Sequence, residues 1–466
     1  MQRFKRFIGD KKFYKQVFTI ILPIILQQFM LSVAGYIDGL MINSYGGEGY
    51  VEAFNGVSAA NKLMFVLTFI WIALASTASI FISQYYGAKN KEKIHEALRL
   101  SVYAAVVIGI VSFLVIQFAG NSIVDLFLTN PEGRNYGYRY LDYIKWCTII
   151  TAVTIAFSNA FRSIEKTMLP LISAAAGIVV NIFFNYCLIF GHFGFPELDS
   201  AGAAIATVLS RVVELIIILS IALIPKKSYF KSAFAKLKVS IDLLKQYFKK
   251  GVPLVFNELM WSVAVVLFAL FYTWKNDMWY NAFAYSQNIT DLFFIMFAGL
   301  GNGTAIIVGS SLGAGKFEEA KANADRMKGL GIMLGLGLGV LMAITSPFIA
   351  DMFHPDAATK AITIEIINIT SIFLAIYAYN SVCFFILRSG GDSLRAFILD
   401  QMPTYLISLP IAIVLGINAK NWGLTLATVF AIAHICDIVK LFLSTYFVKK
   451  NKWIVNLTVK KNQFPN

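Results

Sequence analysis

Charge is what this sequence has least of. Only 14% of its 466 residues are Asp, Glu, Lys or Arg, against about 25% in an average soluble domain. Hydrophobic residues make up 58% of the chain, and the mean hydropathy is +0.68. A chain with so little charge cannot coat a water-facing surface, which excludes a soluble enzyme, a nucleic-acid-binding module and a disordered regulator. The composition predicts an integral membrane protein.

Motifs of enzymes and metal proteins are also missing. No Walker A phosphate loop occurs, which excludes ATP as the direct energy source. The glycine-rich stretch 329–339 lies within an apolar run and not after a strand, so it indicates close helix contacts or flexible points. The cysteines lack the paired spacing of a zinc site or disulfide framework, and we predict buried free thiols. They are Cys147, Cys187, Cys383 and Cys436.

Long apolar runs are what the sequence has in abundance. A helix that crosses a bilayer needs about 20 apolar residues, and twelve runs reach that length. They are continuous and lack the alternation of barrel strands, so we predict an all-α polytopic membrane protein with twelve transmembrane helices. The runs centre on 17–42, 56–85, 98–119, 138–160, 168–190, 202–224, 252–274, 280–312, 329–349, 362–387, 396–416 and 423–447.

The basic residues predict how the chain is oriented. With the N-terminus in the cytoplasm, the inner segments contain 31 of the 40 Lys and Arg residues, and the outer segments contain seven. Cytoplasmic loops of membrane proteins are enriched in Lys and Arg. A wrong helix count would scramble this alternation. We therefore expect a multi-pass protein of the cytoplasmic (inner, plasma) membrane with both termini in the cytoplasm.

The two halves of the chain resemble each other. The segment 23–34 matches 253–264 at an offset of 230 residues, with Pro, Met, Ser, Val and Ala in common. The pattern predicts two six-helix lobes related by a pseudo-twofold axis along the membrane normal. The predicted parts are an N-terminal lobe at 1–224, a basic cytoplasmic linker at 225–250, and a C-terminal lobe with a cytoplasmic tail at 251–466.

Several motifs together resemble one transporter family. The first apolar run contains Leu22-Pro23 and Tyr36-Ile-Asp38-Gly-Leu-Met41, the second ends at Gly87-Ala88, and Leu387-Arg-Ser-Gly-Gly-Asp392 follows the tenth. The motifs Asn181-Ile-Phe-Phe-Asn185 and Gly202-Ala-Ala-Ile-Ala-Thr207 lie in the fifth and sixth runs. In this combination the chain resembles the bacterial multidrug and toxic compound extrusion (MATE) transporters over nearly its whole length. Related flippases for lipid-linked sugars usually have fourteen helices, so twelve favours the drug-extrusion branch.

The first apolar run contains an isolated acid, Asp38. A charge inside a membrane is costly and marks a functional candidate. Asn181 and Asn185 are four residues apart and share one helix face, and Thr207 adds a hydroxyl. A carboxylate with neutral oxygens suits Na⁺ or a proton. The alternatives are an Asp38 that only faces a water-filled crevice and asparagines that only join helices. By resemblance, the four residues match the family's N-lobe ion or proton site and would be the metal ligands if the ion is Na⁺. Some relatives have Asp at the position of Asn185.

The second half offers Glu258, preceded by Asn257. By resemblance to the NorM-like branch, this Glu is a cation-binding residue for coupling. That branch also uses an Asp on the tenth helix, but the corresponding stretch 375–381 has no acid. Asp291 is a candidate replacement.

Other charges in the apolar runs are predicted to be structural. Arg211 and Glu214 are three residues apart, as are Asp437 and Lys440, so each pair can neutralise itself. His434 is either a proton relay with Asp437 or a satisfied polar group. Asp400 is expected to line the inner half of the cavity.

Aromatic residues make up 15% of the chain. A cleft of aromatic side chains around a few carboxylates would suit large lipophilic cations. The alternative for most single rings is lipid contact or core packing. The candidate cleft residues are Tyr36, Asn257, Trp261, Asp291, Tyr377 and Asn380.

These features predict a cation-coupled antiporter that exports amphipathic, cationic small molecules by alternating access. Na⁺ or H⁺ is the coupling ion, and no other cofactor is expected. The alternatives are a flippase for a lipid-linked or amphipathic metabolite and, more remotely, an ion channel. The expected partners are the small-molecule substrates and membrane lipids, without nucleic acid, and the expected state is a monomer.

Overall fold

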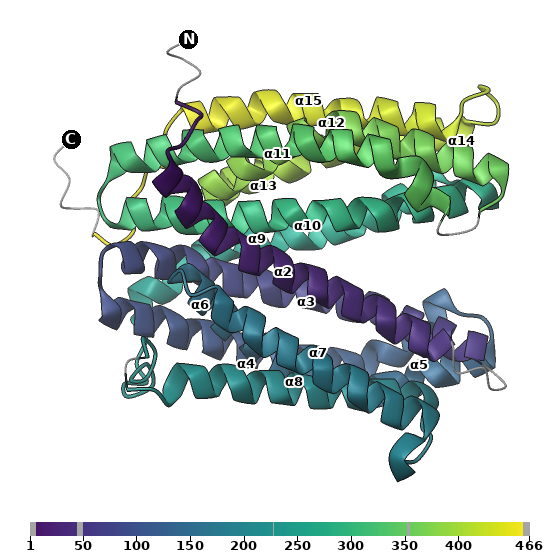
Figure 1. Cartoon of the computed structure of the whole chain (residues 1–466), viewed down its shortest axis with the longest axis horizontal. Coiled ribbons are helices and arrows are strands. Elements are labelled where there is room, and N and C mark those ends of the chain that lie inside the picture. Colours follow the sequence, from purple (N-terminus) through teal and green to yellow (C-terminus); the bar gives the residue numbers. More distant parts are fainter. Residues whose placement is uncertain (1–5, 44–49, 227, 352–354, 460–466) are drawn as a thin grey trace. The chain divides into compact units, whose positions relative to one another are not determined.

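The computed structural model describes residues 6–43, 50–226, 228–351 and 355–459, and in these ranges every regular element is a helix (Figure 1). The first half contains α2 (Lys11–Asn43), α3 (Tyr50–Gly87), α4 (Lys91–Phe127), α5 (Pro131–Ile144), α6 (Cys147–Ser163), α7 (Met168–Phe190), the short η1 (His192–Gly194) and α8 (Asp199–Leu223). The second half contains α9 (Ile241–Tyr272), α10 (Asp277–Gly313), α11 (Phe317–Asp351), α12 (Ala357–Ser389), α13 (Ser393–Pro403), η2 (Thr404–Ser408), α14 (Leu409–Asn418) and α15 (Leu426–Lys449).

The number of membrane spans agrees with the sequence. Within the described residues, eleven helices are long and apolar enough to cross a membrane, and the bent pair of α5 and α6 makes a twelfth. The predicted all-α fold with twelve spans is therefore confirmed. The run 138–160 is not one straight helix, because the chain bends by 55° between Ile144 and Cys147. There the backbone N–H groups of Trp146 and Thr148 bond to carbonyls three residues earlier, those of Tyr143 and Lys145, instead of four. The Thr148 hydroxyl also donates to the carbonyl of Gly109 at 3.0 Å.

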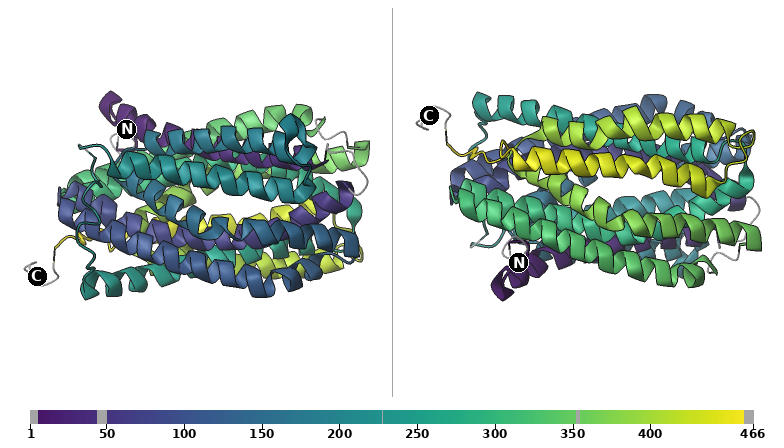
Figure 2. Two further views of the ribbon diagram at one scale, coloured as in Figure 1. Left: turned by 90° about the horizontal axis from the view of Figure 1, so that it is seen from below. Right: turned by 90° about the horizontal axis from the view of Figure 1, so that it is seen from above.

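Two compact units divide the chain, and each has its own packing. One unit comprises residues 22–82 and 90–248. In it α8 packs on α5, α6 and α7, and α4 packs on α5 and α6. Its buried core lies around Trp71 and Leu141, and the indole nitrogen of Trp71 donates a hydrogen bond to the buried Ser112 hydroxyl at 2.9 Å. The helices of each unit lie along one another's length (Figure 2).

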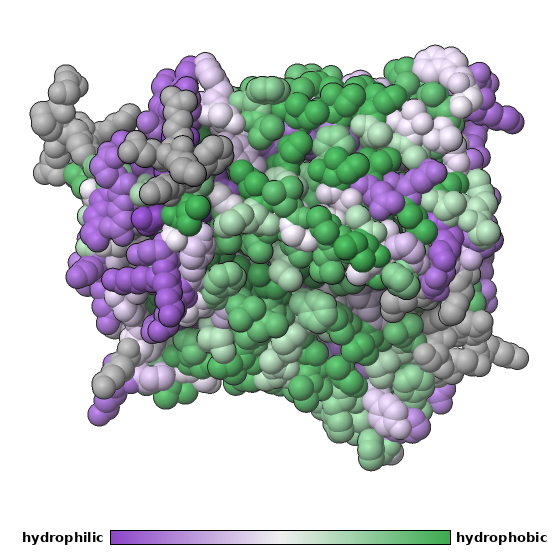
Figure 3. Space-filling model, turned by 45° about the horizontal axis from the view of Figure 1, so that its top comes forward, coloured by the Kyte–Doolittle hydropathy of each residue, from purple (hydrophilic) through white to green (hydrophobic). Residues whose placement is uncertain are grey.

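The other unit comprises residues 1–21, 83–89 and 249–466. Here α12 packs on α10, α11 and α15. Small residues allow the close approach of α11 and α12, since a Cβ atom on Gly335 would lie 2.6 Å from the Cα of Ala375. Hydrophobic residues cover the middle of the molecule's helices and hydrophilic residues gather towards the helix ends (Figure 3), as a bilayer requires.

The described part of the predicted basic linker makes specific contacts with α4. Phe230 and Ala233 are fully buried. The Arg99 guanidinium on α4 donates hydrogen bonds to the carbonyls of Ala233 and Lys238 at 2.6 and 3.1 Å. The segment before α9 is thereby held on α4 and groups with residues 90–248.

Candidate functional site

The first candidate site is the Asp38 cluster, made of Asp38 on α2, Asn181 and Asn185 on α7, and Thr207 on α8. The Asn185 amide donates hydrogen bonds to Asp38 Oδ1 at 2.5 Å and to Asn181 Oδ1 at 3.3 Å. The Asn181 amide lies 3.4 Å from the Thr207 hydroxyl. The structure thus brings all four predicted residues into one chain of contacts across three helices.

The direct partner of the Asp38 carboxylate is an amide, and Arg211 acts on its charge only from farther away. Within the described residues, Asp38 forms no salt bridge. Arg211, on α8, is held by Glu214 at 2.7 Å, which confirms the predicted pair. Asn185 is completely buried, and its Oδ1 has no hydrogen-bond partner in the described part of the chain. One carboxylate with spare amide and hydroxyl oxygens is a donor set that suits a monovalent hard cation or a proton.

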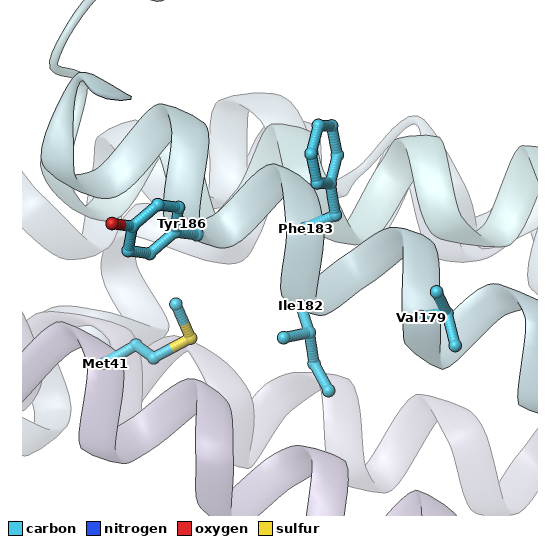
Figure 4. A pocket seen from close by; sticks show the side chains of 5 residues that line it. All are labelled: Met41, Val179, Ile182, Phe183 and Tyr186. Carbon is cyan, nitrogen blue, oxygen red and sulfur yellow. The ribbon is translucent and has the colours of Figure 1, made fainter. Parts of the chain in front are cut away.

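An apolar depression lies between α2 and α7, the helices that carry Asp38 and Asn185 (Figure 4). Its volume is about 440 Å³. Met41 lies one turn after Asp38, and Tyr186 follows Asn185 directly in the chain. The sequence analysis missed these lining residues, although their spacing of i, i+3, i+4 and i+7 on α7 is the signal of one helix face. They are Met41, Val179, Ile182, Phe183 and Tyr186.

The second candidate site is the Asp400 cluster, made of Asp400 and Gln401 on α13, Asn257 on α9, and Lys440 on α15. Asp400 Oδ2 accepts hydrogen bonds from Gln401 at 2.8 Å and from Asn257 at 3.2 Å. Asp400 Oδ1 lies 3.3 Å from Lys440 Nζ. A carboxylate from one helix thus joins a base and two amides inside the membrane-spanning part.

Glu258 is also paired, which the sequence analysis did not foresee. Its carboxylate lies 3.7 Å from an Arg388 guanidinium nitrogen, and both side chains are largely buried. The guanidinium of Arg388 also lies 5.1 Å from the ring centres of Phe384 and Phe385. Glu258 therefore has a counter-ion in direct contact, whereas Asp38 forms no salt bridge within the described ranges.

The internal repeat relates Arg388 to Arg162 at an offset of 226, and Glu258 to Gln28 at an offset of 230. Arg162 donates a 2.6 Å hydrogen bond to the Gln27 side chain. The two halves thus place an arginine in corresponding positions and supply it with different partners.

Asp437 and Lys440 stabilise each other's charge, as predicted, but each makes its direct contact with another side chain. Asp437 lies 2.8 Å from His434 Nδ1, and Lys440 reaches Asp400 on another helix. The spacing of three residues on α15 permits a pair of Asp437 with Lys440. The packing of α13 against α15, however, brings the carboxylate of Asp400 within reach of Lys440 as well. Asn380 joins the neighbourhood, because its amide donates to the Asp437 carbonyl at 3.1 Å and accepts from Ser444 at 2.9 Å.

The remaining cleft candidates are spread over several helices. Tyr36 and Trp261 are 46% and 38% exposed. Tyr377 stacks on Phe294 with ring centres 4.5 Å apart. Asp291 is exposed on α10, and no hydrogen bond or salt bridge joins it to Glu258 in the described ranges. Asn257 and Asn380 are buried and bonded to neighbouring side chains or backbone.

Groups of three or more His, Cys, Asp or Glu side chains that could hold a metal ion are absent from the described residues. The four cysteines are buried and free.

Comparisons with known proteins agree over most of the chain. A family model described as MatE matches residues 23–187 and again 253–417. The two matches lie 230 residues apart, the offset of the internal repeat. The uncharacterized transporter YisQ of Bacillus subtilis is 25% identical over 413 residues, which cover 88% of this chain and 89% of that protein.

A further relative is named "Probable multidrug resistance protein NorM", from Thermotoga maritima. It is 24% identical over 441 residues, covering 94% of this chain and 93% of that protein. The solved structure of a MOP superfamily transporter from Pyrococcus furiosus superposes with a TM-score of 0.85 at 17% identity, covering 98% of both chains. At this identity the likeness supports the fold alone.

Proposed function

Since this chain belongs to the MatE family of membrane transporters, we propose that it is a cation-coupled antiporter that exports amphipathic, cationic small molecules. The observation that carries the proposal is the Asp38 cluster: an acid within a membrane span, held by Asn185 at 2.5 Å and without a salt bridge in the described residues. A group of this kind can bind and release a cation. The names of relatives such as NorM support drug-like substrates.

The proposed cycle uses differential binding. Na⁺ or H⁺ enters at Asp38 from outside and favours one conformation, and the substrate favours the other. Transport against a gradient requires that the cation bind the two conformations with different affinities. The depression between α2 and α7, lined by aromatic and apolar side chains, supports a substrate with a large apolar part. We place the protein in the cytoplasmic membrane with both termini inside.

The flippase alternative predicts unpaired bases in the membrane for a phosphate-bearing substrate. The pairings within each unit speak against it. Arg211, Arg388 and Lys440 each lie beside a carboxylate, namely Glu214, Glu258 and Asp400. Arg162 differs, because its hydrogen bond goes to the Gln27 amide oxygen. Three of these four bases are therefore neutralised, which favours the antiporter.

The test is efflux of cationic dyes from proteoliposomes, with Na⁺ and H⁺ gradients imposed separately. Asp38→Asn keeps the shape of the side chain and removes the charge. We expect at least a tenfold loss of uphill dye transport, because the variant lacks the charge that binds the coupling cation. Downhill dye exchange should remain.

Asp142→Asn is the matched control, since Asp142 is an exposed acid of the same half that pairs with Lys145 at 2.9 Å. It should transport at the parental rate. Uphill transport by Asp38→Asn at the parental rate would refute the coupling site. A current too large for the turnover rate of an alternating-access transporter would indicate a channel instead.

A further inference from the structure

Lys440 forms a salt bridge with Asp400 within the membrane-spanning part of the chain. Its ammonium lies 3.3 Å from Asp400 Oδ1, and the side chains of Lys440 and Asp400 are 16% and 31% exposed. Lysine is tolerated inside a membrane only with a partner. Asp400 is the more accessible member of the pair, so an external cation can approach the carboxylate that Lys440 occupies.

The surroundings of Asp400 contain more acceptors than this one ammonium satisfies. Asn257 and Gln401 both use their N–H groups on Asp400 Oδ2. Their carbonyl oxygens, Asn257 Oδ1 and Gln401 Oε1, are buried and have no hydrogen-bond partner in the part of the chain that the structure describes. The two side chains are 3% and 1% exposed. A buried oxygen without a donor is unfavourable, and a nearby cation would compensate for it.

The backbone next to Asp400 is also irregular. The helix changes to a single π turn, η2, directly after Pro403. Such turns recur at functional sites because they widen the helix and redirect side chains. The Tyr405 hydroxyl in this turn donates to the carbonyl of Met260, on the helix that supplies Asn257.

We propose that Asp400 receives the cationic group of the exported substrate, and that Lys440 is a tethered cation which this group displaces. The inference rests on the proposed function and names an ammonium, phosphonium or similar organic cation as the group recognised. The exchange leaves Asp400 neutralised before and after binding, so no bare carboxylate is exposed to the membrane interior. Asp437 lies three residues before Lys440 on α15, and this spacing gives the displaced ammonium a second carboxylate within reach.

The test is equilibrium binding of tetraphenylphosphonium to the full-length protein in lipid nanodiscs. Lys440→Gln removes the internal competitor and should bind the probe about tenfold more tightly, since a close charge pair is worth at least that factor. Asp400→Asn should bind it at least about tenfold more weakly. Lys440→Arg keeps the competing charge and should behave like the parent.

Lys328→Gln is the matched control, because Lys328 is a buried lysine of the same unit that pairs with Asp325 at 2.6 Å. Its probe affinity should equal that of the parent. Unchanged or weaker binding by a folded Lys440→Gln overturns the proposal, as does parental binding by Asp400→Asn. If Lys440→Gln does not fold, the Asp400→Asn, Lys440→Gln double variant decides: weak binding supports the proposal and parental binding overturns it.

Dye transport by the parent is measured in the same preparation. Failure of the parent to move dye uphill would refute the proposed function. Normal parental transport with an unchanged affinity in Lys440→Gln would refute the role of Lys440 alone.

Discussion

At the scale of single residues, the acidic side chains inside the membrane-spanning part have different direct partners in the two halves of the chain. Asp38 is held by an amide, whereas Glu258 and Asp400 lie beside Arg388 and Lys440. An acid without a base in direct contact can bind and release a cation at low cost, whereas an acid in a salt bridge must first displace its base. This asymmetry makes Asp38 the better candidate for binding a coupling ion.

Asn185→Asp tests the chemistry of the Asp38 cluster. The change removes the 2.5 Å hydrogen bond to Asp38 and places two carboxylates side by side. Like charges this close require a cation or a proton between them. We expect at least about tenfold tighter Na⁺ or H⁺ binding, measured by isothermal titration in detergent, and slower release during transport. Cation affinity equal to that of the parent would show that Asp38 is not a ligand.

Glu258 and Arg388 provide a second prediction. Breaking a buried ion pair from one side leaves a bare charge and costs about 3 kcal/mol. Glu258→Gln and Arg388→Gln should each lower thermal stability, and the double variant should recover most of the loss. Additive losses would show that the pair is not coupled. If the stable double variant still fails in dye efflux, Glu258 or Arg388 acts in transport beyond neutralising its partner.

At the scale of helices, glycine determines the distance between α11 and α12. Gly335→Ala forces a Cβ to within 2.6 Å of the Ala375 backbone and should lower stability by about 1–3 kcal/mol. Gly337 is the internal control, because a Cβ there meets nothing within 4 Å. Gly337→Ala should be neutral or slightly stabilising. Thermal unfolding in one detergent compares the two variants, and equal melting temperatures would contradict the close packing.

Helix geometry also explains what the sequence could predict. The Arg211–Glu214 pair follows from spacing on one helix, and it was foreseen. Lys440 has an acid at the same spacing, yet it pairs across helices. The partner of Lys440 depends on how α13 packs on α15, and residue spacing within one helix carries no information on that packing. For the same reason the sequence could not predict Arg388 as the partner of Glu258, since the two residues are 130 positions apart in the chain. The apolar runs, in contrast, determine the twelve spans directly.

At the scale of the whole molecule, orientation is the main prediction. Lys231 and Glu197 are both exposed, and the charge distribution places them on opposite sides of the membrane. The native cysteines are buried, so background labelling should be low. An impermeant maleimide on intact cells should label Glu197→Cys and should label Lys231→Cys only after lysis. Labelling of Lys231→Cys from outside would invert the topology.

The π turn η2 has a consequence for how this span can change. A single extra residue in an α-helix rotates everything after it by about 100°. The faces of α13 and α14 are therefore offset, with Asp400 before the turn and Gly416, which packs on the backbone of Phe271, after it. Removing one residue from Thr404–Ser408 would restore a regular helix and give the span a single continuous face. The side chains on one side of the turn would then have to leave their neighbours. The number of residues in this segment is therefore constrained by the packing on both sides of it.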